Sequence, residues 1–122
     1  MKDFADSIGA FWADVLKGNG TYNVTLVSMS EFGRNVRQNA NAGTDHGRGG
    51  AMFVMGHAIN GGQVLTKNWQ PLAVENLQDR QDVKVMIDHR DVLAEIVQNR
   101  LGNANLNVIF PGYTPTTLGV TK

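Results

Sequence analysis

A long polar segment with five glycines separates two apolar runs of this chain and covers residues 31–50, EFGRNVRQNANAGTDHGRGG. Compact domains rarely contain a connection of this length unless it has a function of its own. We therefore expect this segment to carry functional residues, and the rest of the fold to be built from the apolar runs on either side of it.

Short apolar runs predict the strands. Residues 22–30, YNVTLVSMS, are rich in β-branched side chains and indicate a buried strand. Residues 51–56, AMFVMG, indicate a second short strand, and residues 83–87, VKVMI, indicate a third. In residues 58–66, AINGGQVLT, an Asn60–Gly61 turn lies between apolar flanks, which predicts a hairpin.

Two segments repeat apolar residues at the spacing of an α-helix. The first stripe consists of Phe4, Ile8, Phe11, Trp12, Val15 and Leu16. Asp3 is a suitable N-cap for that helix and Gly18 a suitable stop. The second stripe consists of Val92, Leu93, Ile96, Val97 and Leu101, with Asp88 as the N-cap and Gly102 as the stop. Pro and Gly in residues 103–122 predict a mostly irregular tail.

The succession of these elements predicts the fold class. The order helix, strand, loop, strand, hairpin and helix is α/β in character. A length of 122 residues falls within the usual size of one domain. We therefore expect a single α/β domain over residues 1–122, with a few strands, a hairpin and two main helices.

Composition excludes several classes of function. Eleven basic residues balance eleven acidic ones, whereas nucleic acids and anionic membranes normally select a basic surface. The absence of cysteine excludes disulfides, thiolate metal sites and a cysteine nucleophile. Aspartates interrupt the apolar residues of the N-terminal segment, so the sequence as written predicts no signal peptide and a cytoplasmic location.

Asp45 and His46 are the first candidate site residues, and Gly43 and Gly47 flank them. The glycines permit a turn, which both side chains need to reach one ion because adjacent strand residues point to opposite faces. Imidazole and carboxylate suit zinc, manganese or iron, but zinc normally takes three or four ligands from a protein. The alternative is that both side chains only hydrogen-bond within the loop.

The second candidate follows the first predicted strand. Ser30, Glu31 and Arg34 lie in the sequence SEFGR, and ligands of open α/β sheets bind at the carboxyl ends of strands. In this position Glu31 is suited to bind a metal or act as a base, and Arg34 to hold an anionic oxygen. The competing interpretation is a helix start that Ser30 caps.

Other polar residues are less specific. Arg48, together with Arg34 and Arg37, is suited to form a small basic cluster for a phosphate or sulfate ester. His57 and His89 are interpreted as surface or capping residues. The GRGG run lacks the Lys-Ser/Thr pair of a phosphate-binding P-loop, so nucleotide binding is unsupported.

Several motifs taken together resemble a known family. They are SEFGRNVRQNANAGTDHGRGGAMFVMG, NGG, DHRDVLAEI and FPGYTP. They are similar to the C-terminal part of a large, mostly exported bacterial family of unknown function, the domain of unknown function 1501 type. That family is placed in the alkaline phosphatase and sulfatase superfamily. The resemblance covers nearly the whole chain and implies a fragment of an alkaline-phosphatase-like α/β sandwich.

The resemblance also implies a chemistry. Members of the superfamily hydrolyse phosphate or sulfate esters with metal ions and a Ser, Thr or modified Cys nucleophile, and members of the family are several times longer than this chain. The resemblance implies that the nucleophile and the first metal-binding Asp lie outside this sequence. We therefore assign no catalytic residue here and expect no complete two-metal mechanism from this chain alone.

Two ways of matching the motifs assign different metal ligands. In the first, TDHG is similar to a Ser-Asp-His-Gly motif, and both Asp45 and His46 are ligands. In the second, Glu31 takes the Asp position and Phe32 the His position, and His46 belongs to a later ligand segment. We prefer the second because the strand before SEFGR is the stronger one, although Phe32 then removes one ligand. His46 is common to both.

Two hypotheses follow. In the first, the chain is the C-terminal piece of a metal-dependent ester hydrolase, with Glu31, Asp45 and His46 as ligands of a divalent metal and Arg34 and Arg48 as anion contacts. In the second, it is a non-catalytic domain that forms a homo-oligomer or binds a partner chain, because a sheet cut from a larger sandwich exposes edges and apolar faces. Neither nucleic acid nor a membrane is an expected partner.

Overall fold

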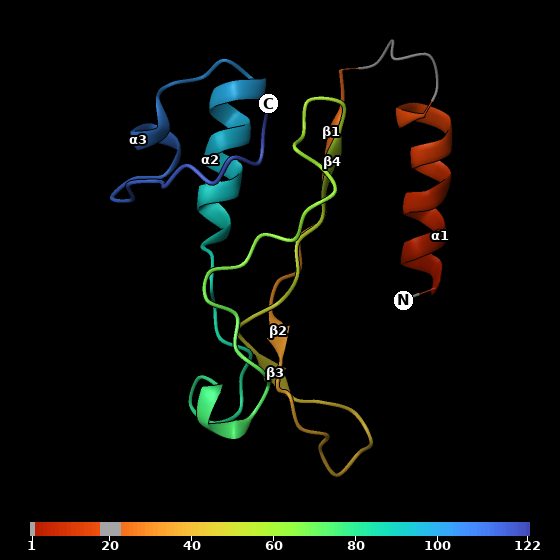
Figure 1. Cartoon of the computed structure of the whole chain (residues 1–122), viewed down its shortest axis with the longest axis vertical. Helices are drawn as coiled ribbons and strands as arrows, with labels where there is room; N and C mark the ends of the chain where they lie inside the picture. The colour runs from red at the N-terminus through yellow and green to blue at the C-terminus, as the bar shows by residue number, and fades with distance from the viewer. Residues whose placement is uncertain (1, 18–22) are drawn as a thin grey trace.

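The computed structural model describes residues 2–17 and 23–122, apart from the side chain of Leu16. Within them the chain forms three α-helices, two short helical turns of other types and two antiparallel two-stranded sheets (Figure 1). The elements are α1 (Lys2–Phe11), η1 (Trp12–Leu16), β1 (Thr25–Val27), β2 (Gly33–Arg34), β3 (His46–Gly47), β4 (Val54–Gly56), η2 (Val74–Asn76), α2 (His89–Arg100) and α3 (Leu106–Ile109). The predicted α/β class is confirmed.

The two sheets follow one another along the same two stretches of chain. β1 pairs with β4, and between them in the sequence β2 pairs with β3. The backbone N–H of Ser28 extends the first pair by donating to the carbonyl of Phe53 at 2.9 Å. The N–H of Phe53 donates in turn to the Ser28 hydroxyl oxygen, also at 2.9 Å. The polar segment 31–50 is therefore a second hairpin that prolongs the first, and not a simple loop.

The predicted strands at residues 22–30 and 51–56 are confirmed in part: β1 lies at the centre of the first range and β4 at the end of the second. β1 and β4 each contain three residues, and Tyr22 lies outside the described residues. Each strand has a partner on one side only, and after Ser28 the chain continues into the polar hairpin.

The core lies where α2 packs against β1, β4 and the C-terminal segment (Figure 1). Its buried side chains are Ile59, Val92, Ile96 and Val120, and the partly buried ones around them are Val27, Met52, Val54, Ile87 and Leu118. Burial of one such side chain contributes about 1.5–3 kcal/mol. Since Val92 and Ile96 both belong to α2, this helix is the central element of the fold.

α2 begins and ends as predicted. The Asp88 carboxylate accepts a hydrogen bond from the backbone N–H of Arg90 at 2.9 Å, which is the N-cap interaction. Gly102 follows the helix with a φ of +65°, a conformation that glycine adopts without strain. The apolar stripe is shorter than predicted because Leu101 lies beyond the helix and is 73 % exposed.

Two of the predicted strand elements are wrong. The flanks of Asn60–Gly61 do not pair with each other, because Ile59 forms an antiparallel bridge with Thr121 and the Asn60 N–H donates to Val120 O at 2.9 Å. Residues 83–87 form no strand either. Both segments had apolar residues at suitable positions, but a strand also requires a neighbouring backbone to pair with.

The N-terminal helix is confirmed, with a different start. α1 begins at Lys2, so Asp3 lies in its first turn and is not the N-cap. The helix continues into the π-helical turn η1, and the predicted stop at Gly18 lies outside the described residues.

α1 stands beside the β1/β4 pair, at the opposite side from α2 (Figure 1). No residue of α1 is buried. Phe4 contacts Phe53, with ring centroids 6.1 Å apart, yet Phe4 remains 43 % exposed and Trp12 45 % exposed. The predicted apolar stripe is therefore real, but the described part of the chain covers it only in part. Among the described residues, no helix combines the length and apolar character that crossing a bilayer requires.

Candidate functional site

Glycines allow β2 and β3 to lie unusually close to their neighbours. A Cβ at Gly33 would be 1.8 Å from the carbonyl oxygen of Gly49, and one at Gly47 would be 2.7 Å from the carbonyl carbon of Arg34. A Cβ at Gly49 would meet the carbonyl oxygen of Val83 at 2.4 Å. The glycine-rich composition of the polar segment thus serves close backbone packing, and this packing sets the register of the hairpin.

The register places His46 directly opposite Arg34. The His46 ring lies against the Phe32 ring, with centroids 3.9 Å apart and planes tilted by 38°. The Arg34 guanidinium lies 5.3 Å from the centroid of the same Phe32 ring. An imidazole, a guanidinium and an aromatic ring therefore share one exposed face of the hairpin. Arg34 is also held by its Nη1, which donates to the carbonyl of Thr44 at 2.6 Å.

Asp45 takes part in the structure of the hairpin loop. Its Oδ1 accepts a hydrogen bond from Asn39 Nδ2 at 2.8 Å. The side-chain oxygen of Asn39 accepts from the backbone N–H groups of Asn41 and Gly43, at 3.0 and 3.1 Å. The alternative role, in which Asp45 hydrogen-bonds the loop to itself, is therefore observed, and the carboxylate remains exposed to solvent.

Glu31 lies on an exposed bend just before β2. In the part of the chain that the structure describes, no three His, Asp or Glu side chains are grouped so that they could hold a metal ion. Glu31, Asp45 and His46 therefore do not form a metal cluster by themselves. Their assignment as ligands stays a prediction, and it requires further ligands from elsewhere.

Arg48, the second predicted anion contact, points to another part of the fold. Its Nη2 lies 3.5 Å from Asp79 Oδ2, and both side chains are more than half exposed. An exposed ion pair of this kind stabilises a fold by at most about 1 kcal/mol, so an anion could compete for the guanidinium. The contact also joins the β2/β3 hairpin to the turn at residues 78–82. His57 and His89 are exposed, as expected for surface residues.

Sequence reasoning missed a buried carboxylate on α2. Glu95 Oε2 accepts hydrogen bonds from the N–H groups of Leu118 and Gly119, both at 2.9 Å. Burial alone would raise the pKa of Glu95, but the hydrogen bonds from the Thr121, Leu118 and Gly119 N–H groups and the Thr121 hydroxyl hold that pKa below its usual value. Glu95 is therefore an ionised clamp for the C-terminal segment.

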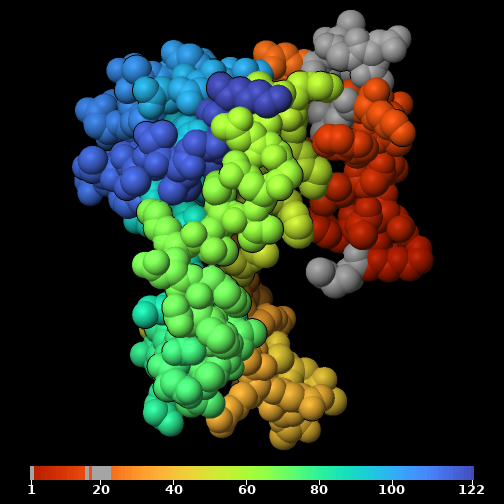
Figure 2. Space-filling view, in the orientation of Figure 1, coloured from red at the N-terminus to blue at the C-terminus, as the bar shows by residue number. Residues whose placement is uncertain are grey.

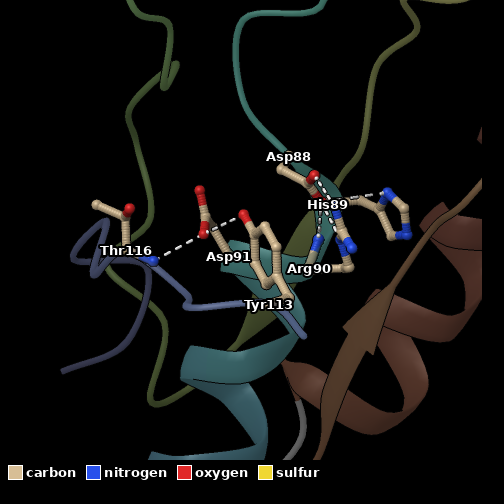
Figure 3. A network of polar contacts seen from close by, with 6 residues as sticks. All are labelled: Asp88, His89, Arg90, Asp91, Tyr113 and Thr116. Atoms are coloured by element: carbon tan, nitrogen blue, oxygen red, sulfur yellow. Dashed lines mark hydrogen bonds and ion pairs between the residues drawn. The ribbon is translucent and has the colours of Figure 1, made fainter. Parts of the chain in front are cut away.

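Asp91, one helical turn before Glu95, makes a second clamp (Figure 3). Its Oδ1 accepts hydrogen bonds from the Tyr113 hydroxyl and from the Thr116 N–H, both at 2.7 Å. The hydrogen bond to Asp91, followed by burial, raises the pKa of Tyr113 to about 12. The spacing of Asp91 and Glu95, i and i+4 on a face that also carries Val92 and Ile96, was the available signal in the sequence.

Arg90 completes this network at the start of α2 (Figure 3). Its Nε and Nη2 donate to the two carboxylate oxygens of Asp88, at 3.0 and 2.7 Å. Its guanidinium also lies 3.8 Å from the centroid of the Tyr113 ring. The hydrogen bond from the Arg90 side chain lowers the pKa of Asp88 to about 2, against the effect of burial.

The carboxylates of α2 and the exposed face of the β2/β3 hairpin are suited to different chemistry. The carboxylates of α2 have backbone and hydroxyl donors as partners, so they serve to position the C-terminal segment. The face of Phe32, Arg34 and His46 is exposed and presents a cationic group and an imidazole to solvent. It is therefore the place in the described structure best suited to contact an anion or to supply one metal ligand.

A family model described as a protein of unknown function (DUF1501) matches residues 1–109. No match to this chain was found among curated proteins or solved structures.

Proposed function

Since the chain belongs to the DUF1501 family of proteins of unknown function over residues 1–109, we propose that it is the C-terminal portion of a metal-dependent phosphate or sulfate ester hydrolase. In this proposal it belongs to the alkaline phosphatase and sulfatase superfamily and supplies anion and metal contacts, while the nucleophile comes from another part of the domain. The observation that carries the proposal is the pairing of Arg34 with His46 across the β2/β3 hairpin.

Arg34 would hold the ester. A guanidinium presents several donors in one plane and binds the oxygens of phosphate or sulfate esters. Packing on Phe32 and the hydrogen bond to Thr44 O restrict its position. Arg48 would add a second anion contact on release from Asp79.

His46 would supply one of the metal ligands. Its imidazole is exposed, and imidazole and carboxylate donors suit zinc, manganese and iron. Glu31 and Asp45 would contribute carboxylates, but the described residues form no group of three ligands. The remaining ligands would therefore come from the rest of the domain, and a divalent metal held there would polarise the ester for hydrolysis.

Incomplete burial supports the view that this is a portion of a larger domain. No side chain of α1 is buried, and large apolar side chains are exposed in most parts of the described structure. They are Phe4, Trp12, Met29, Phe32, Phe53, Val64, Leu65, Trp69, Leu72, Val85, Leu101, Val108 and Ile109. Phe4 lies against Phe53, and Trp69, Leu72 and Val85 border one hollow. Large contiguous apolar patches on a monomer usually mark an interface, so further protein would cover some of these side chains.

Metal analysis tests the hydrolase proposal. The protein and its His46→Ala variant would be purified without chelator, dialysed against zinc or manganese, and analysed for bound metal. We expect the substitution to lower the metal content, because one ligand is lost. His57→Ala is the matched control, since His57 is also exposed but lies outside the hairpin. Equal metal content in the wild-type protein and His46→Ala would refute the assignment.

The second candidate function is a non-catalytic domain that self-associates. The half-exposed apolar stripe of α1, which includes Phe4 and Trp12, favours it. In this case two copies would bury their α1 stripes against each other, and the chain would bind neither metal nor ester. Light scattering across a dilution series tests this, with Phe4→Ser as the variant that should dissociate the oligomer. A monomer at every concentration would contradict self-association.

A further inference from the structure

A shallow hollow lies between residues 68–77 and residues 83–86. These residues belong to the lower part of the molecule in Figure 2. Its volume is ≈ 450 Å³, which is within the range of about 300–1,000 Å³ that small-ligand pockets occupy. None of the predicted metal or anion residues lines it. The hollow is therefore a separate candidate site.

A tight turn holds the two walls of the hollow together. The N–H of Gln78 donates to the carbonyl of Asp82 at 3.0 Å, and the N–H of Asp82 donates back to Gln78 at 2.9 Å. Between them, Asp79 and Arg80 both adopt positive φ angles, 51° and 61°. Asp82 also forms an antiparallel bridge with Asn35. The turn between the two walls is thus attached to the polar hairpin.

The apolar part of the lining is open to solvent. Its most exposed large side chains are Trp69, Leu72 and Val85, which are 51 %, 49 % and 52 % exposed. An exposed indole has a flat face with negative electrostatic potential, which attracts polarised C–H groups stacked on it. The hollow therefore favours a ligand with a flat, weakly polar face.

The polar part of the lining carries groups that bind hydroxyls. The amides of Asn68, Gln70 and Asn76 offer both donors and acceptors. Asn76 is held in place because its Nδ2 donates to the carbonyl of Pro71 at 2.9 Å, and its side-chain carbonyl oxygen can still accept a hydrogen bond. Glu75 and Lys84 add one negative and one positive charge, and neither forms an ion pair with another described residue.

We propose that this hollow binds a neutral saccharide, with one face of the sugar ring on Trp69 and its hydroxyls on the neighbouring amides and Glu75. The charges of Glu75 and Lys84 cancel, so a strongly charged ligand gains no net attraction. A wholly apolar ligand would leave the amides and charged groups without partners, which is unfavourable. A sugar ring has an apolar face and hydroxyls at its rim, and it satisfies both parts of the lining. This proposal is independent of the ester hydrolase proposal.

Tryptophan fluorescence tests the proposal directly, because the chain contains only two tryptophans. In the Trp12→Phe variant, Trp69 is the only indole, and its emission would be followed during titration with maltose, cellobiose, lactose and chitobiose. We expect a saturable change with at least one of them. In the Trp12→Phe background, Val108→Ala is the control, because Val108 is exposed and lies outside the hollow.

Binding by calorimetry then separates loss of the site from loss of the fold. We expect Trp69→Ala to weaken saccharide binding at least about tenfold, equivalent to about 1.4 kcal/mol, and Trp69→Phe to retain part of it. Glu75→Ala should weaken binding with an unchanged circular dichroism spectrum, since Glu75 is exposed. No saturable signal with any of the four sugars, or equal affinity in wild type and both Ala variants, would overturn the proposal.

Discussion

Glu95 of α2 accepts hydrogen bonds from both donor groups of Thr121, its backbone N–H and its hydroxyl. Glu95 Oε1 accepts a hydrogen bond from the Thr121 backbone N–H at 2.7 Å and another from its hydroxyl at 3.0 Å. Because the other oxygen holds Leu118 and Gly119, one carboxylate fixes the end of the chain on α2. This places Val120 in the core next to Ile59.

Replacement of Glu95 with glutamine should destabilise the fold. The side-chain amide of the introduced glutamine would place N–H donors where the carboxylate accepts hydrogen bonds, leaving a buried donor without a partner. We expect the free energy of unfolding in urea to fall by about 2–3 kcal/mol. Glu75→Gln is the matched control, because Glu75 is exposed, and it should change stability little. A Glu95→Gln variant as stable as Glu75→Gln would contradict the clamp.

The same carboxylate should make stability depend on acid. The native pKa of Glu95 lies below the ordinary value of 4.5, so the unfolded chain binds its proton more readily. The contribution of Glu95 is fully present above that ordinary pKa and is lost as the pH falls through the lower native pKa. Urea midpoints measured from pH 7 to pH 2 should decline in acid, and the decline should be shallower in Glu95→Gln. Parallel curves for the two proteins would argue against this.

Asp88 combines an N-cap with an ion pair, and two variants separate these roles. Asp88→Ala removes both and should lower the free energy of unfolding by about 1 kcal/mol or more. Asp88→Asn keeps a capping oxygen for the Arg90 N–H but loses the ion pair, so its loss should be smaller. Since the pKa of Asp88 is about 2, the difference between Asp88→Asn and wild type should persist at pH 4 and diminish near pH 2. Identical losses in both variants would show that capping contributes nothing.

Close backbone packing at Gly33 predicts a strong effect of a single methyl group. The added Cβ of Gly33→Ala would lie 1.8 Å from the Gly49 carbonyl oxygen, which forces the backbones of the hairpin apart. We expect a loss of at least about 1–3 kcal/mol in denaturant unfolding. At Gly61 nothing lies within 4 Å of an added Cβ, so Gly61→Ala should change stability by less than about 0.5 kcal/mol. Similar effects at both positions would exclude the steric explanation.

The predictable parts of the fold are those with a local cause. The stripe of α2, its Asp88 cap and its stop at Gly102 depend on residues within a few positions of one another. The strands β1 and β4 also follow from short β-branched or apolar runs. The prediction of a hairpin at Asn60–Gly61 was wrong, because Ile59 in its flank pairs instead with Thr121, far along the chain.

The candidate site also has one part that the sequence predicts and another part that it does not. The polar segment is recognisable from its residue types, which also indicate Arg34, Asp45 and His46 as candidate site residues. The sequence does not predict that Arg34 lies opposite His46 across a hairpin or that the Phe32 ring packs on His46. Both contacts depend on how closely the glycines of two segments approach each other. The buried carboxylates of α2 were missed because an acidic residue in a helix is normally solvated.

The amino-acid sequence by itself determined the α/β class, the two main helices and the position of the polar segment, since these depend on local conformational preference and on periodic apolar side chains. Only the tertiary structure decided that Ile59 pairs with Thr121, that Glu95 is buried as a carboxylate, and that Arg34 faces His46. Each of these depends on hydrogen bonds or packing between distant segments. Contacts of this kind form only in the folded chain, because the favourable free energy of the whole fold must offset the loss of chain entropy and the desolvation of charged groups.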